Sequence, residues 1–270
     1  MKLREGFFEV LLASFLWGTV GVAIEYFYDL GSSPYSLVFF RTLISGIISF
    51  FLVDLKVLTK GEGILMGLIS AFFYELYALA VTIDGASLAT VLLFTSPLWV
   101  TLISWRLVKE GITAIKVISS LLIISGVYLM YLGTGTILQI AIGLASGLIY
   151  GLLISYSRLL QVKQYREKEI IAFQSIWGMP FVLPFLRGVN LPSLYGGVYL
   201  ALFASIIPYY FFYRGMKKSD SVTATIISSM EPVFTIAIAI PLLKEHLNGL
   251  QLLGASIIIA SVMINGIIKR

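Results

Sequence analysis

Three charged side chains lie deep inside stretches of sequence that are otherwise apolar. Glu75 falls about twelve residues into one stretch, Glu231 about ten into another and Arg41 about seven into a third. A charge inside a bilayer is costly, so such residues usually pair with one another or face a polar cavity. We interpret Arg41 as a buried pairing partner of Glu75 or Glu231. A buried carboxylate could also accept a proton or hold a substrate ammonium group, and Glu231 is the better placed because it directly precedes Pro232.

Aromatic side chains form a second group of candidates. Tyr and Trp rings offer an apolar face with one polar atom, which suits a solute of mixed polarity or a cation. The alternative is simple packing or an interfacial aromatic belt. With the two buried carboxylates and one glycine, these rings make up the predicted substrate cavity: Trp17, Gly18, Tyr74, Glu75, Tyr77, Trp99, Tyr150, Tyr209, Tyr213 and Glu231.

Prolines and glycines add mechanical features. Pro97 and Pro232 each interrupt an apolar stretch, so we predict them as hinges at which backbone carbonyls are freed. Gly143, Gly147 and Gly151 recur every four residues, a spacing typical of close contact between membrane helices.

The composition places these residues in a membrane. Hydrophobic residues make up 59% of the 270 residues and charged residues 12%, with a mean hydropathy of +0.96. No water-soluble domain can bury that much apolar surface. Cysteine is absent, which excludes disulfides and thiolate metal sites. The net charge of +5 is best explained by topology, and we expect no nucleic-acid partner.

Apolar runs between charged or turn-forming residues define ten spans, each close to the length of about 20 residues that a bilayer requires. The chain therefore reads as an all-α membrane protein with ten transmembrane helices. The predicted spans are 7–28, 35–53, 63–82, 86–106, 113–132, 137–157, 169–186, 195–214, 221–242 and 249–268.

Loop charges orient these spans. With the N-terminus inside, the outer segments hold only Arg187 and Lys244, and Arg41 falls within a span. The other sixteen basic residues are cytoplasmic: Lys2, Arg4, Lys56, Lys60, Arg106, Lys109, Lys116, Arg158, Lys163, Arg166, Lys168, Arg214, Lys217, Lys218, Lys269 and Arg270. This bias predicts a multi-pass protein of the cytoplasmic membrane with both termini in the cytoplasm.

One motif occurs twice, 135 residues apart. Ala89-Thr90, Pro97 and Lys109-Glu110 in the first half match Ala224-Thr225, Pro232 and Lys244-Glu245 in the second. We predict two five-helix repeats, residues 1–133 and 134–270. Five helices return the chain to the opposite side, so the second repeat is inverted relative to the first. The copies differ where Glu231 replaces Ser96, which we predict to be the place where symmetry gives way to chemistry.

These motifs resemble the EamA family within the drug/metabolite transporter superfamily, over essentially the whole chain. The residues that carry the resemblance are Trp17-Gly18, Arg41, Ala89, Pro97, Glu110, Ala224, Pro232, Glu245 and Gly254. One departure is Gln174, which stands where the first repeat has Arg41. The resemblance implies a solute carrier, often an exporter of amino acids or related metabolites, with a central cavity between the halves.

The predicted function is therefore secondary transport of a small polar or amphipathic metabolite by alternating access, with an amino acid or related compound moved in the direction of efflux. A lipid flippase or a passive channel is the alternative. An intramembrane enzyme is disfavoured, because the single histidine, His246, falls in a loop and no pair of intramembrane aspartates exists. We expect no cofactor or metal, a small-molecule substrate, proton coupling through a buried carboxylate, and a monomer or homodimer.

Overall fold

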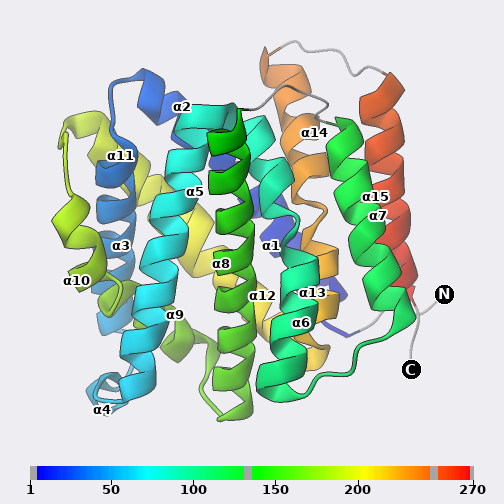
Figure 1. The fold of residues 1–270 in the computed structure, drawn as a ribbon. Helices are drawn as coiled ribbons and strands as arrows, with labels where there is room; N and C mark the ends of the chain where they lie inside the picture. Colours follow the sequence, from blue (N-terminus) through cyan, green and yellow to red (C-terminus); the bar gives the residue numbers. More distant parts are fainter. Residues whose placement is uncertain (1–4, 131–135, 244–248, 268–270) are drawn as a thin grey trace.

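The computed structural model describes residues 5–130, 136–243 and 249–267, which form helices joined by short turns, with no strand among them (Figure 1). The motif residues Lys244 and Glu245, the single histidine His246 and the basic residues Lys2, Arg4, Lys269 and Arg270 lie outside this part of the chain. The helices are α1 (Phe7–Trp17), α2 (Val20–Asp29), α3 (Pro34–Phe50), α4 (Leu55–Leu58), α5 (Gly61–Leu93), α6 (Ser96–Val108), α7 (Ala114–Met130), α8 (Ile137–Val162), α9 (Glu167–Ile176), α10 (Met179–Val182), η1 (Leu183–Phe185), α11 (Leu191–Leu200), η2 (Ala201–Ile206), α12 (Ile207–Lys218), α13 (Ser221–Ser228), α14 (Glu231–Leu243) and α15 (Gly249–Ile267).

Several stretches are long and apolar enough to cross a bilayer, judged by length and composition. Four of them have at least 18 helical residues: Phe7–Asp29, Gly61–Ile83, Ile137–Val162 and Leu191–Lys218. Three shorter apolar helices accompany them: Pro34–Phe50, Ala114–Leu129 and Gly249–Asn265. The upright helices stand side by side in one bundle, with α7 and α15 forming a neighbouring pair (Figure 1).

Helix α5 changes direction although its hydrogen bonding is continuous. Three hydrogen bonds trace its path along α8: Tyr156 Oη to the carbonyl of Glu62 (3.3 Å), Gln139 Nε2 to the carbonyl of Ile83 (3.2 Å), and Ser104 Oγ of α6 to Ser155 Oγ (2.9 Å). The chain therefore runs from the C-terminal end of α8 to its N-terminal end and returns. The reversal falls between Ile83 and Leu93, the interval that contains the predicted boundary between spans 63–82 and 86–106.

Three of the predicted spans are broken into shorter helices. The first divides at Gly18-Thr19, the seventh at Trp177-Gly178 and the ninth at Ser229-Met230. Glycine weakens a helix, and a proline one or two residues later cannot donate the next backbone hydrogen bond. The seventh span is broken most, because Pro180 and Pro184 follow its glycine.

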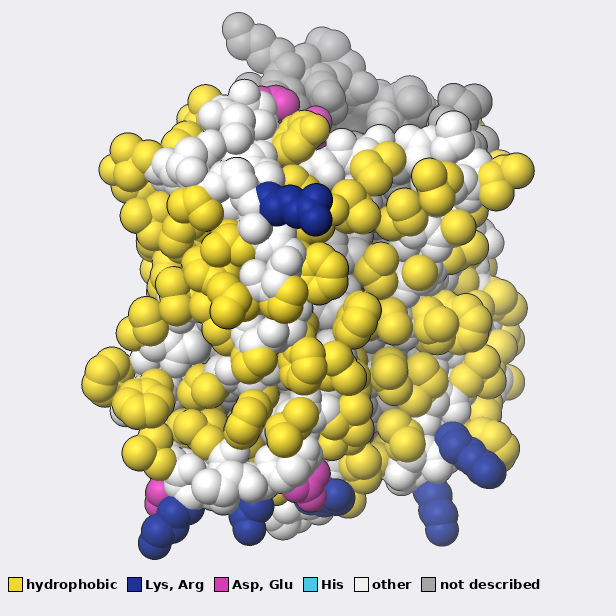
Figure 2. Space-filling model, turned by 60° about the vertical axis from the view of Figure 1, so that its left-hand side comes forward, with side chains coloured by type: hydrophobic (Ala, Val, Ile, Leu, Met, Phe, Trp, Pro, Cys, Tyr) yellow, Lys and Arg dark blue, Asp and Glu magenta, His cyan; other side chains and the backbone are white. Residues whose placement is uncertain are grey.

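The outer surface is apolar around the middle of the bundle. Large hydrophobic side chains such as Phe8, Phe51, Phe72, Leu102 and Tyr128 are at least half exposed. Figure 2 shows hydrophobic side chains covering the middle of one face, while lysine and arginine side chains gather at its lower edge. This distribution is the reverse of a soluble protein and matches contact with lipid.

Ion pairs gather at the same end of the bundle, which we call the basic end. It is where α1, α5, α9 and α13 begin and α6, α8 and α12 end. The pairs there are Lys116–Asp220 (3.0 Å), Arg158–Glu110 (2.8 Å), Lys163–Glu62 (3.0 Å), Arg166–Glu169 (2.6 Å), Lys217–Glu167 (3.9 Å) and Lys218–Glu9.

Glycines set the closest helix contacts, and two of these contacts match between the halves. A Cβ on Gly151 of α8 would lie 2.6 Å from the Cβ of Trp99 in α6. A Cβ on Gly18 would lie 2.9 Å from the Cβ of Phe234 in α14. Trp99 and Phe234 are 135 residues apart, and Gly18 and Gly151 occupy corresponding places in the repeated motif. The close approach of these backbones is the role expected for small residues at membrane-helix contacts.

Replacing Gly151 by alanine should therefore force α6 and α8 apart. We expect the free energy of unfolding to fall by about 1–3 kcal/mol, the usual cost of overpacking. Thermal unfolding of the purified protein in detergent measures this loss. Gly61→Ala is the matched control, because nothing lies within 4 Å of a Cβ at Gly61. An unchanged melting temperature in Gly151→Ala would show that this contact does not limit packing.

Candidate functional site

Two helix breaks at corresponding positions place helix starts inside the bundle. Helix α5 ends at Leu93 and α6 begins at Ser96, while α13 ends at Ser228 and α14 begins at Glu231. The two starts are 135 residues apart, and a proline follows each one directly. Proline is tolerated there, since the first turn of a helix has no intrahelical acceptor for its backbone N–H groups. The predicted hinges Pro97 and Pro232 thus lie at helix breaks.

A third irregularity lies in the opposite wall. Residues Ala201–Ile206 form a π-helical segment, η2, between α11 and α12. Wider π turns displace carbonyls from the regular pattern, so that side chains can use them. The carbonyl of Ala204 accepts hydrogen bonds from Trp17 Nε1 at 3.1 Å and from Arg41 Nη2 at 3.0 Å.

Arg41 is buried, but it has partners other than those expected. Its Nε donates to Ser205 Oγ at 2.6 Å, and its Cζ lies 3.8 Å from the centroid of the Tyr74 ring. No carboxylate among the described residues lies within ion-pair distance of it. The predicted pairing with Glu75 or Glu231 is therefore wrong. A hydroxyl, a displaced carbonyl and an aromatic face replace the carboxylate as partners for the guanidinium.

Arg41, Glu231 and several aromatic rings line one closed cavity at the centre of the bundle. Its volume is about 30 Å³ for the centre of a water-sized sphere, which is room for only a few water molecules. The residues that line it are Trp17, Val20, Arg41, Phe73, Tyr77, Leu93, Tyr150, Ala204, Tyr209 and Glu231.

Ring contacts hold the aromatic wall together. Trp17 lies edge-on to Tyr209 with ring centroids 5.1 Å apart, and edge-on to Tyr150 at 6.5 Å. Phe73 stacks on Tyr150 at 4.8 Å. Each of these pairs joins a residue of the first half to one of the second, so the wall is itself the interface between the halves.

The two charges of the cavity come from different halves of the chain. Arg41 is supplied by α3, and Glu231 is the first residue of α14. The side chain of Glu231 is 6% exposed, and the described residues give its carboxylate no hydrogen-bond or ion-pair partner. The start of a helix carries a partial positive charge, which favours a carboxylate at this position.

Half of the predicted cavity residues line this cavity: Trp17, Tyr77, Tyr150, Tyr209 and Glu231. Two others support it from behind, because Tyr74 lies under Arg41 and Tyr213 stacks on Tyr209. Gly18 and Trp99 serve helix contacts instead. Glu75 lies in a separate cavity, since neighbouring positions on α5 point in directions about 100° apart.

The lining residues that the sequence did not reveal are Val20, Phe73, Leu93 and Ala204. Phe73 was detectable in principle, because it lies one turn before Tyr77 and stacks on it at 5.9 Å. Ala204 carries no chemical signal in its side chain. Its contribution is a backbone carbonyl, whose exposure depends on the π segment.

Networks of polar contacts close the bundle toward the basic end. Glu110, just after α6, accepts hydrogen bonds from Arg158 Nε at 2.8 Å and from Ser221 Oγ at 2.6 Å. Nearby, Asp220 caps α13 and pairs with Lys116. Burial alone would raise the pKa of the Asp220 carboxyl, but the Lys116 cation and the Thr223 hydrogen bonds outweigh burial and hold this pKa below its ordinary value.

A smaller network closes the other end. Ser33 Oγ donates to the carbonyl of Arg187 at 2.6 Å, and Asn190 Nδ2 donates to the carbonyl of Gly31 at 2.8 Å. Ser36 and Ser193, at the starts of α3 and α11, share a hydrogen bond of 2.7 Å. The central cavity is therefore shut off by polar contacts at both ends.

Known proteins place this architecture among transporters. A crystal structure of another protein superposes with a TM-score of 0.78 at 17% identity, covering 96% of this chain and 95% of that one, which shows a shared fold. An uncharacterized transporter of Archaeoglobus fulgidus is 26% identical over 266 residues, 97% of this chain and 96% of the relative. An uncharacterized inner membrane transporter of Salmonella typhimurium is 24% identical over 299 residues, 99% of this chain and 97% of the relative.

Family membership follows from two matches within the chain. Residues 4–132 and residues 137–267 each match the EamA-like transporter family, so nearly the whole chain is covered and the family unit occurs twice. Multiple apolar helices and a polar, closed central cavity are what a multi-pass membrane transporter requires. The chain belongs to the EamA-like transporter family.

Proposed function

We propose that the protein is a secondary transporter that moves a small zwitterionic metabolite, an amino acid or a related compound, across the cytoplasmic membrane. The observation that carries this proposal is the placement of Arg41 and Glu231 in the wall of one closed cavity. A guanidinium and a carboxylate match the carboxylate and ammonium groups of an amino acid. The aromatic rings between them suit an apolar side chain. The direction of efflux is proposed from the family resemblance.

Arg41 has donors to spare for a substrate. A guanidinium has five N–H groups, and the bonds to Ser205 and Ala204 use two of them. Because these bonds hold the side chain in place, substrate binding would cost it little conformational entropy. Glu231, which lacks a protein partner in the described part of the chain, is the group we assign to a substrate ammonium or to a transported proton.

Alternating access is the mechanism that the arrangement favours. A cavity of about 30 Å³ is too small for an amino acid, so the bundle must open before substrate enters. We assign the Glu110–Arg158 and Ser221 contacts to a cytoplasmic gate and the Ser33–Arg187 and Ser36–Ser193 contacts to an outer gate. The matching helix breaks and glycine contacts of the two halves support inverted repeats over residues 1–133 and 134–270 that exchange conformations.

The proposed topology has ten spans, with the basic end in the cytoplasm. The absence of native cysteine allows a direct test, because every labelled thiol is then an introduced one. In intact cells, a membrane-impermeant maleimide should label Val189→Cys and should label Lys60→Cys only after permeabilisation. Both positions are exposed. The opposite pattern would invert the topology, and labelling of both in intact cells would refute a barrier between them.

Reconstitution into proteoliposomes tests the function itself. We expect saturable uptake and counterflow of at least one amino acid from a panel, measured with and without a pH gradient. Saturation and counterflow separate a carrier from a passive channel, and a lipid-scrambling assay addresses the flippase. Intact protein that moves no solute of the panel would contradict the proposed substrate class.

Glu231→Gln should lower the transport rate while expression stays normal. The expected loss is roughly ten- to hundredfold, the effect of removing one charge-assisted hydrogen bond. Ser96→Ala, at the corresponding position of the first repeat, is the matched control and should leave the rate within about twofold, because the Ser96 hydroxyl has no partner. A wild-type rate in Glu231→Gln would remove this residue from the mechanism.

Arg41→Lys should raise the KM for a transported amino acid by about tenfold, because a single ammonium cannot hold Ser205 and Ala204 while also binding a carboxylate. The corresponding amine, which lacks the carboxylate, should compete equally well in wild type and variant. Concentration-dependent uptake with amine competition measures both. Equal loss for the amino acid and the amine would assign Arg41 a purely structural role.

A further inference from the structure

A second cavity, unconnected with the residues of the central one, opens on the apolar flank of the bundle. It lies between α5 and the α10–η1 segment and has a volume of about 490 Å³. That volume is within the range of small-molecule sites. We call it the lateral cavity, and it is lined by Tyr35, Leu68, Ala71, Phe72, Glu75, Leu76, Leu79, Pro180, Phe181, Pro184 and Phe185.

Its wall on α5 is one stripe of the helix. The lining positions 68, 71, 72, 75, 76 and 79 follow the three- and four-residue spacing of a single helical face. Phe72 is 52% exposed and Phe185 is 45% exposed, so the mouth of the cavity lies on the apolar outer surface. A ligand dissolved in the lipid could therefore enter from the side.

Glu75 is the only charged residue that lines this cavity in the described part of the chain. Both of its carboxylate oxygens are buried, and neither has a hydrogen-bond partner among the described residues. An unpartnered buried carboxyl group is costly, and a protein that keeps one usually uses it. Arg187, the nearest cation in the ring contacts, lies 6.0 Å from the Tyr35 centroid and is not part of the lining.

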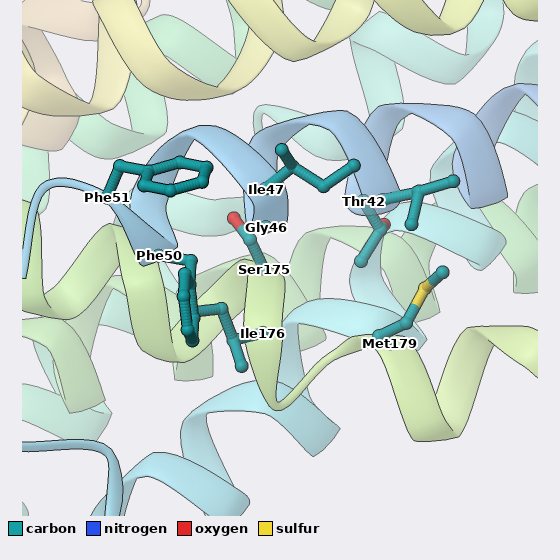
Figure 3. Close-up of a pocket in the computed structure, with 9 residues that line it drawn as sticks. Thr42, Gly46, Ile47, Phe50, Phe51, Ser175, Ile176 and Met179 are labelled. Carbon is teal, nitrogen blue, oxygen red and sulfur yellow. The ribbon is translucent and has the colours of Figure 1, made fainter. Parts of the chain in front are cut away.

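A comparable cavity shows what Glu75 adds. A groove of about 430 Å³ lies between α3 and the α9–α10 segment, where Ile47, Phe50 and Met179 line it (Figure 3). Its polar lining groups are the hydroxyls of Thr42 and Ser175, and Ser175 already donates to the carbonyl of Ile171 at 2.9 Å. No charged side chain lines this groove, so it offers a ligand no electrostatic selectivity.

We propose that the lateral cavity binds a lipophilic amine, with the ammonium group on Glu75 and the apolar body between Phe72, Phe181 and Leu79. The ammonium supplies the hydrogen-bond donor that Glu75 lacks. Aromatic faces at Tyr35, Phe72, Phe181 and Phe185 attract the same cation. This site is distinct from the proposed amino-acid cavity, because Glu75 and Glu231 belong to different cavities.

The test uses decylamine as the probe and decanol as its neutral counterpart, with the full chain in phosphatidylcholine nanodiscs. Binding of radiolabelled probe is measured against empty nanodiscs, which subtracts partition into lipid. We expect saturable decylamine binding at a single site and decanol binding weaker by about tenfold, the effect of one charge-assisted hydrogen bond. No saturable binding above the empty discs would overturn the proposal.

Variants locate the site. Glu75→Gln should weaken decylamine binding by about tenfold and leave decanol unchanged. Leu79→Trp should exclude both probes by filling the cavity, whereas Ile47→Trp, in the groove of Figure 3, should exclude neither. Glu231→Gln should leave decylamine binding within about twofold of wild type. Equal binding in Glu75→Gln and wild type, or a loss in Glu231→Gln as large as that in Glu75→Gln, would overturn the assignment.

Folding is measured on the same samples. Because Glu75 makes no hydrogen bond among the described residues, Glu75→Gln keeps the shape and breaks no contact, and we expect its thermal unfolding to match or exceed wild type. If Glu75→Gln is nevertheless unstable, Glu75→Asp and Leu79→Trp decide. Asp keeps the carboxylate and should bind decylamine more tightly than decanol, and absence of that preference would count against the site.

Discussion

The centre of this protein depends on keeping one guanidinium group inside an apolar bundle. Arg41 is 5% exposed and has no described carboxylate partner, so hydrogen bonds and an aromatic face must replace the water it has lost. The π segment supplies the carbonyl of Ala204 and the hydroxyl of Ser205, and Tyr74 supplies the ring. Trp17 binds the same carbonyl, which connects the aromatic wall to the same irregular turn.

Irregular backbone recurs wherever the cavity has a polar wall. The π segment of η2 and the helix break before Glu231 both lie at its edge, and the break before Ser96 lies at the corresponding place in the first half. In a low-dielectric interior, a broken helix is tolerated where its polar groups find other partners or line a cavity. Local strain and the polar site are thus two aspects of one arrangement.

The two buried carboxylates show how one residue type takes two roles in one fold. Glu231 begins a helix at the interface between the halves and faces Arg41 across a small closed cavity. Glu75 lies within a continuous part of α5, one position after Tyr74, and faces a larger and almost wholly apolar cavity. A rotation of one residue along the helix separates a site between the halves from a site open to lipid.

Near-symmetry of the halves makes their differences informative. Gly18 and Gly151 make corresponding contacts, and α6 and α14 begin at corresponding residues. At these corresponding positions, Ser96 and Glu231 differ, as do Gln174 and Arg41. Gln174 donates to Tyr213 Oη at 2.7 Å and belongs to the supporting layer, whereas Arg41 reaches the cavity. Both charges of the cavity therefore lie at positions where the repeat is broken.

The sequence by itself determined the helical membrane character, the duplicated motif and the residues worth suspecting. These follow from local quantities: apolar length, charge distribution, proline and glycine spacing. The boundaries of most spans agree with the helices to within a few residues. Broken helices such as α9–α10 were anticipated only through their prolines, because a break depends on what re-satisfies the backbone.

Only the tertiary structure decided how those residues are grouped. Sequence placed Arg41 beside a carboxylate, but its partners are a hydroxyl, a ring and a carbonyl that three different segments bring together. It placed Glu75 with Glu231, but the direction of a side chain around a helix axis, and the identity of the helix it meets, separate them. Opposite charges attract in any list of residues, whereas contact within a fold is set by packing over distances that local sequence does not encode.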